Sequence, residues 1–103
     1  MKYIFEIEMK PGYPAERYAE AWLEASRIIQ QADGARGTYL HRNLNVPNKL
    51  LAIAHWDSKA QRDAGETLKD PRVKSIIDSQ ARFVTINLVG EYDEPDWSVL
   101  PGG

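Results

Sequence analysis

The segment Leu50–Trp56 constrains the fold more than any other part of the chain, because it is apolar on both faces of an extended strand. The alternate positions of one face are Leu50, Ala52, Ala54 and Trp56, and those of the other include Leu51 and Ile53. A strand of this kind belongs in the middle of a sheet that is covered on both sides. The rest of the sequence must therefore supply neighbouring strands and a cover for each face.

Three more strands are predicted by alternating apolar residues, over residues 2–10, 36–45 and 83–92, with a hairpin turn at 45–48. Apolar residues at i, i+3 and i+4 from Tyr18 to Ala32 predict a long helix that ends near residue 33, before Gly34. Two capping signals, Ser58 with Gln61 and Asp70 with Pro71, predict helical pieces over 58–68 and 71–80. The element order is βαββαβ, which is the order of an α+β, ferredoxin-like sandwich.

In this sandwich both helical regions cover one face of the sheet, so Ile4, Leu51, Ile53 and one apolar row of the last strand are left on the other face. Such a patch is too apolar for a monomer. We therefore expect a twofold homodimer, a dimeric α/β barrel in which the two sheets pair face to face. Residues 1–92 form the expected domain and 93–103 a C-terminal tail, in which Trp97 is expected to contact the second subunit or the outside of its own helices.

Composition excludes several classes of function. The 103 residues carry 13 Lys and Arg against 15 Asp and Glu, so the basic excess of a nucleic-acid-binding protein is missing. Cysteine is absent, which excludes disulfides and thiolate chemistry. No apolar run reaches the ~20 residues that a membrane span needs, and the start of the chain lacks a signal-peptide core, so a cytoplasmic protein without membrane partners is expected. Histidines and acids in metal-ligand spacing are not found, and no metal or other cofactor is expected.

Several features together resemble a known family. They are the amphipathic first strand, the link with Gly34, the hairpin with Pro47 and Asn48, and the sequence Trp56-Asp57-Ser58-Lys59 after the third strand. Over roughly residues 2–92 the chain resembles the dimeric α/β-barrel proteins typified by antibiotic biosynthesis monooxygenase domains. Members of this family include cofactor-independent oxygenases that act on polyketide phenols and related aromatics, haem-degrading oxygenases, and isomerases of small molecules.

The resemblance implies a ligand pocket between the helices and the sheet, with Trp56 in its wall. The expected substrate-binding residues are Tyr3, Phe5, Ile7, Trp22, Tyr39 and Trp56. Trp56 would orient an aromatic substrate by stacking, or simply fill the core beneath the helices. His41 is the candidate catalytic acid or base because its ordinary pKa is near neutrality, although a lone strand histidine is more often a structural residue.

The departures from the family pattern bear on the chemistry. Many relatives carry one histidine where this chain has Gly65 and another where it reads Asp70-Pro71-Arg72. The haem-site positions of the haem-degrading relatives correspond to Ile7 and Ile77, which disfavours haem. Two interpretations remain: a cofactor-independent monooxygenase acting on an aromatic or polyketide-like molecule, or a non-catalytic dimeric binding or accessory protein. On the remaining strand faces, His55 is expected to face the dimer barrel, and Glu6 and Glu8 to pair with Arg42 or a partner chain.

Overall fold

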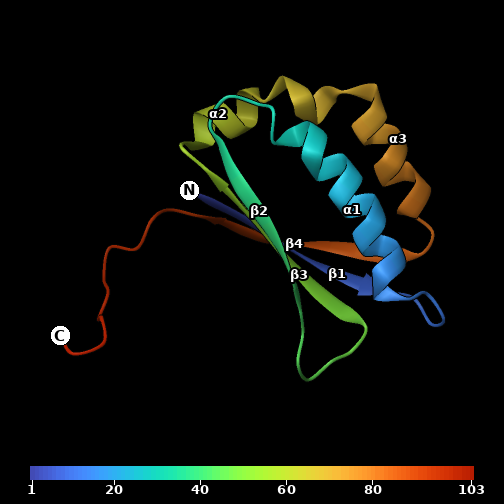
Figure 1. The fold of residues 1–103 in the computed structure, drawn as a ribbon, viewed down its shortest axis with the longest axis horizontal. Coiled ribbons are helices and arrows are strands. Elements are labelled where there is room, and N and C mark those ends of the chain that lie inside the picture. The colour runs from blue at the N-terminus through green and yellow to red at the C-terminus, as the bar shows by residue number, and fades with distance from the viewer.

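The computed structural model describes residues 1–103, apart from the side chain of Glu66, as a four-stranded antiparallel sheet with its helices on one face (Figure 1). The strands are β1 (Lys2–Met9), β2 (Ala35–Arg42), β3 (Lys49–Trp56) and β4 (Val84–Tyr92), in the spatial order β2-β3-β1-β4. The helices are α1 (Ala15–Ile29), α2 (Lys59–Ala64), the 3-10 helix η1 (Glu66–Lys69) and α3 (Pro71–Gln80). The predicted α+β fold is confirmed, and β3 lies between β2 and β1.

The core lies between the helices and the central strands. In the register of β1 and β3, Phe5 is opposite Ala52 and Ile7 is opposite Leu50, and these residues point toward the helices. The larger buried cluster consists of Ile7, Met9, Ala15, Tyr18, Leu50, Ala52 and Val84. A smaller cluster of Met1, Ala35 and Trp56 closes the end of the sheet where β1 begins and β3 ends.

Helix α1 ends at Ile29, earlier than the predicted residue 33. The next backbone N–H groups, those of Gln31 and Ala32, donate to carbonyls three residues back at 3.2 and 3.1 Å, so the chain continues in tight turns rather than in an α-helix. Gly34 follows with a φ of +85°, and a Cβ there would lie 2.7 Å from the Gln61 side chain. The turn therefore requires glycine both for its backbone angle and for the close approach of α2.

The two predicted caps of the second helical region are confirmed. Ser58 Oγ accepts from the Gln61 N–H at 3.1 Å, and Asp70 Oδ1 accepts from the Arg72 N–H at 2.8 Å. The Gln61 side chain accepts from the Ser58 hydroxyl at 3.0 Å instead of returning to a backbone N–H. Helix α2 stops at Ala64 rather than 68, because the ψ of 103° at Gly65 leaves the helical region before η1 begins.

The sheet face away from the helices carries half-buried Ile4, Leu51 and Ile53, as predicted. On β4, however, Ile86 is opposite Ile7 and Leu88 is opposite Phe5, so this apolar row lies on the helical side. The predicted pairing of Glu6 with Arg42 within the chain is wrong. Glu6 lies 3.5 Å from Lys49 on the open face, whereas Arg42 points toward α1 and donates to Glu16 at 2.8 Å. This ion pair lowers the pKa of Glu16.

Residues 93–103 contain no helix or strand and run away from the sheet (Figure 1). Their base is held by Glu94, whose carboxylate accepts from the Met1 ammonium at 3.1 Å and lies 3.5 Å from Lys2 Nζ. Trp97 is 89% exposed, so the expectation that it packs against its own helices is wrong, and its contact with a second subunit stays a prediction. Among the helices of the described chain, none is both long and apolar enough to cross a bilayer.

Candidate functional site

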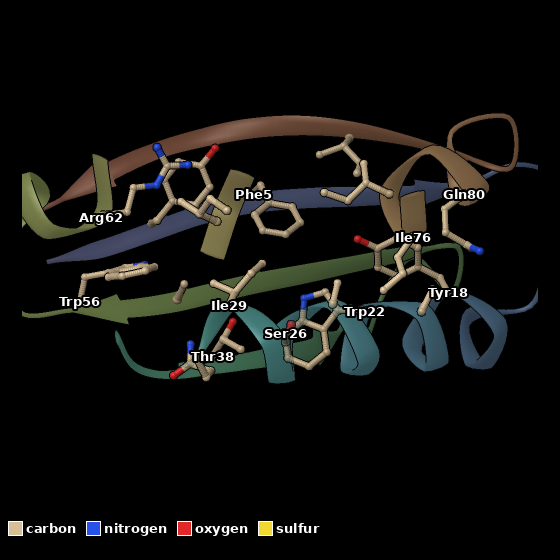
Figure 2. Close-up of a pocket in the computed structure, with 18 residues that line it drawn as sticks. Phe5, Tyr18, Trp22, Ser26, Ile29, Thr38, Trp56, Arg62, Ile76 and Gln80 are labelled. Carbon is tan, nitrogen blue, oxygen red and sulfur yellow. The ribbon is translucent and has the colours of Figure 1, made fainter. Parts of the chain in front are cut away.

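A cavity of about 270 Å³ lies between α1, α3 and the helical face of the sheet (Figure 2). Its walls come from every layer of the fold, so it forms only when the chain is folded. The lining residues are Tyr3, Phe5, Tyr18, Ala21, Trp22, Ala25, Ser26, Ile29, Gln30, Thr38, Ala54, Trp56, Arg62, Leu68, Ile76, Ile77, Gln80 and Ile86. Most of them are apolar or aromatic, as expected of a site for a small organic molecule.

The space exists because helix α1 places small side chains between large ones. Ala21 and Ala25 are one turn apart on the face of α1 that points toward the sheet, and Ala54 faces them from β3. Trp22 and Phe5 flank this gap and give it aromatic walls (Figure 2). Helical side chains four residues apart lie on one face, so the two alanines leave one continuous opening.

Trp56 both fills the core and lines the cavity. The residue is only 4% exposed and packs with Met1 and Ala35, and its side chain also lines the cavity. The Met1 ammonium donates to the Trp56 carbonyl at 2.9 Å, and the Trp56 N–H donates to the Met1 carbonyl at the same distance. The backbone that carries the indole is therefore fixed by the β1–β3 ladder.

One end of the cavity is polar. The guanidinium carbon of Arg62 lies 4.0 Å from the centre of the Tyr3 ring, and Figure 2 shows Arg62 and Trp56 at the same end. Thr38 is opposite Ala54 in the β2–β3 register, and Ala54 is opposite Tyr3 in the β3–β1 register. Thr38 and Tyr3, on which Arg62 packs, are therefore two strand spacings or ~10 Å apart at this end.

Gln30 is at the same end and has one unsatisfied polar atom. Its Oε1 accepts from the Gly37 N–H at 2.7 Å, which fixes which end of the amide is the oxygen. Its Nε2 is buried and has no hydrogen-bond partner among the residues that the structure describes. A buried donor without an acceptor costs about 1–3 kcal/mol, and a ligand acceptor that reached this amide would remove that cost.

The opposite end of the cavity contains Tyr18 and Gln80 (Figure 2). Burial raises the pKa of Tyr18 to about 12, so its phenol is neutral at physiological pH. The Gln80 side chain accepts a hydrogen bond from the Tyr13 hydroxyl, which joins α3 to the loop before α1. Both side chains are therefore polar but uncharged.

Asp63, which follows Arg62 in the chain, and Glu91, which is opposite Tyr3 in the β1–β4 register, are paired with a different cation. Lys59 Nζ lies 2.9 Å from Asp63 and 2.9 Å from Glu91, whereas Arg62 reaches Asp63 only at 3.6 Å. The hydrogen bonds to Asp63 and then Glu91 raise the pKa of Lys59. These pairs tie α2 to β4 and hold the turn that carries Arg62. Arg62 is the one charged side chain among the described residues of the lining.

The structure brings together four of the predicted site residues, Tyr3, Phe5, Trp22 and Trp56, in one cavity. Ile7 has no exposed surface and belongs to the core cluster instead. Placing Tyr39 and His41 in the cavity was wrong, because they are opposite Ile53 and Leu51 and so lie on the sheet face away from the helices. His55 lies on that same face, as predicted, with Tyr39 beside it.

Sequence reasoning missed the polar lining residues. The spacing of Ala21, Trp22 and Ala25 already marks the inner face of α1, and the small residues in it are a usable signal for a cavity. Gln30 and Arg62 occur in polar stretches that are typical of a protein surface, so the sequence does not indicate that they line a cavity. Among the described residues, no group of three or more His, Asp or Glu side chains is arranged to hold a metal ion.

The fold and cavity define a class of small α+β proteins with an apolar cavity beneath the first helix. The chain belongs to the antibiotic biosynthesis monooxygenase family, whose model matches residues 2–65. A variant of SnoaB, a cofactor-independent oxygenase from Streptomyces nogalater, superposes with a TM-score of 0.77 at 18% identity, over 97% of this chain and 95% of that one. A conserved protein from Methanosarcina mazei Go1 gives a TM-score of 0.68 at 13% identity, over 88% and 91%. None of the curated proteins compared matches the sequence significantly.

Proposed function

We propose that the chain is an enzyme that binds a planar aromatic or polyketide-like molecule in this cavity and oxygenates it with O₂ without an organic cofactor. The observation that carries the proposal is the aromatic cavity of about 270 Å³ beneath α1. An apolar cavity of about 150 Å³ holds one benzene molecule, so this one accommodates two or three fused rings. The shared fold of SnoaB, a cofactor-independent oxygenase, supports the proposed class of reaction.

The reaction balances without an external reductant when the substrate supplies the electrons. One O₂ converts an activated CH₂ group to a carbonyl: one oxygen atom enters the product, and the other leaves as water with the two hydrogens of the CH₂. The substrate reacts as its electron-rich anion. The chain contributes orientation, with the rings held between Trp22 and Trp56, and it replaces bulk water by apolar side chains.

The described lining contains no His, Asp, Glu or Lys, and Tyr18 is neutral, so the cavity has no evident general base. The proton of the substrate therefore goes to solvent before or during binding. The same observation favours the second candidate function, a binding protein that sequesters an aromatic molecule without turnover. The two functions differ in whether the bound molecule consumes O₂.

The functional unit in this proposal is a homodimer that pairs the open sheet faces. Ile4, Leu51 and Ile53 form a contiguous apolar strip across β1 and β3 on that face, and Ile4 and Ile53 are directly opposite each other. Tyr39 extends the strip onto β2 and is 52% exposed in the single subunit. A second copy would remove this strip from water.

Anthrone is a suitable test compound because its CH₂ group lies between two aromatic rings and gives anthraquinone on oxidation. We expect the protein to accelerate O₂ uptake, with one O₂ consumed for each anthraquinone formed. Ala21→Phe fills the cavity and should abolish the acceleration, whereas Ala60→Phe on exposed α2 surface should not. Binding of anthrone without O₂ uptake would establish the second function, and neither binding nor uptake would overturn both for this class of ligand.

A further inference from the structure

We propose that the cavity selects its ligand as an oxyanion, with Arg62 as the cationic partner and the Gln30 amide as donor to a second, neutral oxygen. This inference rests on the proposed function and names the form of substrate that the site takes. The residues concerned are outside the set that sequence analysis identified. They act by binding and orienting the ligand, so their test is a binding measurement that does not require turnover.

Arg62 supplies the positive charge that a ligand oxyanion would meet in this cavity. Its guanidinium stacks on Tyr3 at 4.0 Å, which leaves the edge of the planar group, where its N–H donors point, available to a ligand. Its side chain is 25% exposed, and its one ion-pair contact with a described side chain, that of Asp63, is long at 3.6 Å. The neighbouring acids Asp63 and Glu91 are each held by Lys59 at 2.9 Å. A ligand oxyanion would thus meet a cation in a largely apolar surrounding, where the attraction is stronger than in water.

The Gln30 amide would bind the ligand through a neutral hydrogen bond, separately from the charge of Arg62. Gly37 occupies the Gln30 Oε1, so the Nε2 is the polar atom that remains without a partner among the described residues. A carbonyl, hydroxyl or nitro oxygen on the ligand would satisfy it. Gln30 is bonded to β2 and Arg62 packs on β1, two strands whose backbones are ~10 Å apart because β3 lies between them. The two groups therefore favour a ligand with oxygens on opposite edges of its ring system.

Arg62 also explains how the ligand could ionise although the described lining contains no general base. A site that binds the anion more tightly than the neutral phenol lowers the pKa of the bound ligand, by about one unit for each tenfold preference. The ligand then loses its proton to water at a lower pH than it does in solution. Arg62 in this way replaces a general base by stabilising the product of the ionisation.

The probe for the test is 4-nitro-1-naphthol, a two-ring phenol with an acceptor on the opposite edge and different absorption spectra for its neutral and ionised forms. We expect the wild-type protein to lower the pKa of the bound probe by about one unit or more. Arg62→Gln should abolish this shift and weaken binding of the anion about tenfold or more. Arg62→Lys retains the charge and should retain most of the shift.

Two controls separate this effect from a loss of structure. Arg82→Gln makes the same change at an arginine that lies 5.1 Å from the Phe83 ring, outside the cavity lining, and should leave the shift intact. 1-Nitronaphthalene lacks the ionisable oxygen, and its affinity should be the same for the wild type and Arg62→Gln. Gln30→Glu keeps an oxygen that accepts from the Gly37 N–H but removes the amide donor. It should weaken binding of the anionic probe, and this loss should add to the loss caused by Arg62→Gln.

The outcomes distinguish the two proposals. An unshifted probe pKa in the wild-type protein, or an equal shift in Arg62→Gln, overturns the oxyanion inference even if anthrone is oxygenated. If neither aromatic probe binds, the cavity itself is not a ligand site and the proposed function fails with it. A shift that depends on Arg62 together with no O₂ uptake supports the inference and assigns the site to binding alone.

Discussion

Tyr39 packs edge-on against His55, with ring centres 5.4 Å apart and the planes at 88°, on the sheet face away from the helices. The two residues come from neighbouring strands, and Tyr39 is directly opposite Ile53. The aromatic pair therefore adjoins the apolar strip of Ile4, Leu51 and Ile53. We expect this surface to be the centre of the dimer interface.

Ile53→Glu tests that interface. A carboxylate in the middle of the paired sheets would be buried without a partner, which costs several kcal/mol, so the dimer should dissociate at least a hundredfold more readily. Leu23→Glu, on the partly exposed surface of α1, introduces the same group elsewhere and should not change the dimer. Sedimentation across a dilution series measures both. A wild-type protein that is monomeric at micromolar concentration would contradict the prediction.

Deleting residues 94–103 tests the tail. Trp97 and Val99 are almost fully exposed and Leu100 is 72% exposed in the single subunit, so their removal takes little from its core. We expect the truncated subunit to unfold at nearly the same temperature as the wild type, but to form a weaker dimer because these apolar side chains lose their surface on the partner. Equal dimer affinity with and without the tail would show that it has no role in assembly.

The sequence was sufficient for the fold because the decisive signals are local. Alternation in β1, the two-sided apolar run of β3 and the caps at Ser58 and Asp70 each specify an element by short-range chemistry. Helix α1 ends earlier than the sequence predicts, because residues 31 and 32 keep a helix-like pattern while their backbone turns more tightly. The break after Ala64 depends on the conformation of Gly65, which composition alone does not fix.

The sequence predicts the aromatic residues of the candidate site but not its polar residues. Tyr3, Phe5, Trp22 and Trp56 follow from the apolar faces of two strands and one helix. Strand β2 mixes polar and apolar residues on both faces, so its alternation does not show which row points toward the helices. The pairing of β2 with β3 decides this, and it sends Tyr39 and His41 to the open face. Arg62 reaches the cavity through packing on Tyr3, a tertiary contact with no local signature.

Ser58→Ala tests how firmly α2 holds Arg62. The Ser58 hydroxyl accepts from the Gln61 N–H at 3.1 Å at the start of the helix, and loss of such a cap typically costs about 1 kcal/mol. For a domain of this size the melting temperature should fall by about 4–8 °C. Without its cap, α2 should hold Arg62 less firmly, so the pKa shift of the bound 4-nitro-1-naphthol should also be smaller. Ser79→Ala, near the exposed end of α3, is the control, and an unchanged melting temperature in Ser58→Ala would contradict the capping role.

Tyr18→Phe tests whether the other cavity end is shielded from water, through the pH dependence of stability. Burial raises the pKa of Tyr18 to about 12 in the folded chain, against about 10 for an exposed tyrosine in the unfolded chain. Because the folded pKa is the higher one, the stabilisation is fully present below about pH 10 and is lost as the pH rises toward about 12. Over that window the unfolded chain releases the proton first, so the wild type should lose free energy of unfolding relative to Tyr18→Phe, by up to about 1.4 kcal/mol per pH unit. Urea unfolding of both proteins at several alkaline pH values measures the difference. A difference between them that stays constant from neutral pH upward would mean that the Tyr18 phenol is in contact with water, and that this end of the cavity is open.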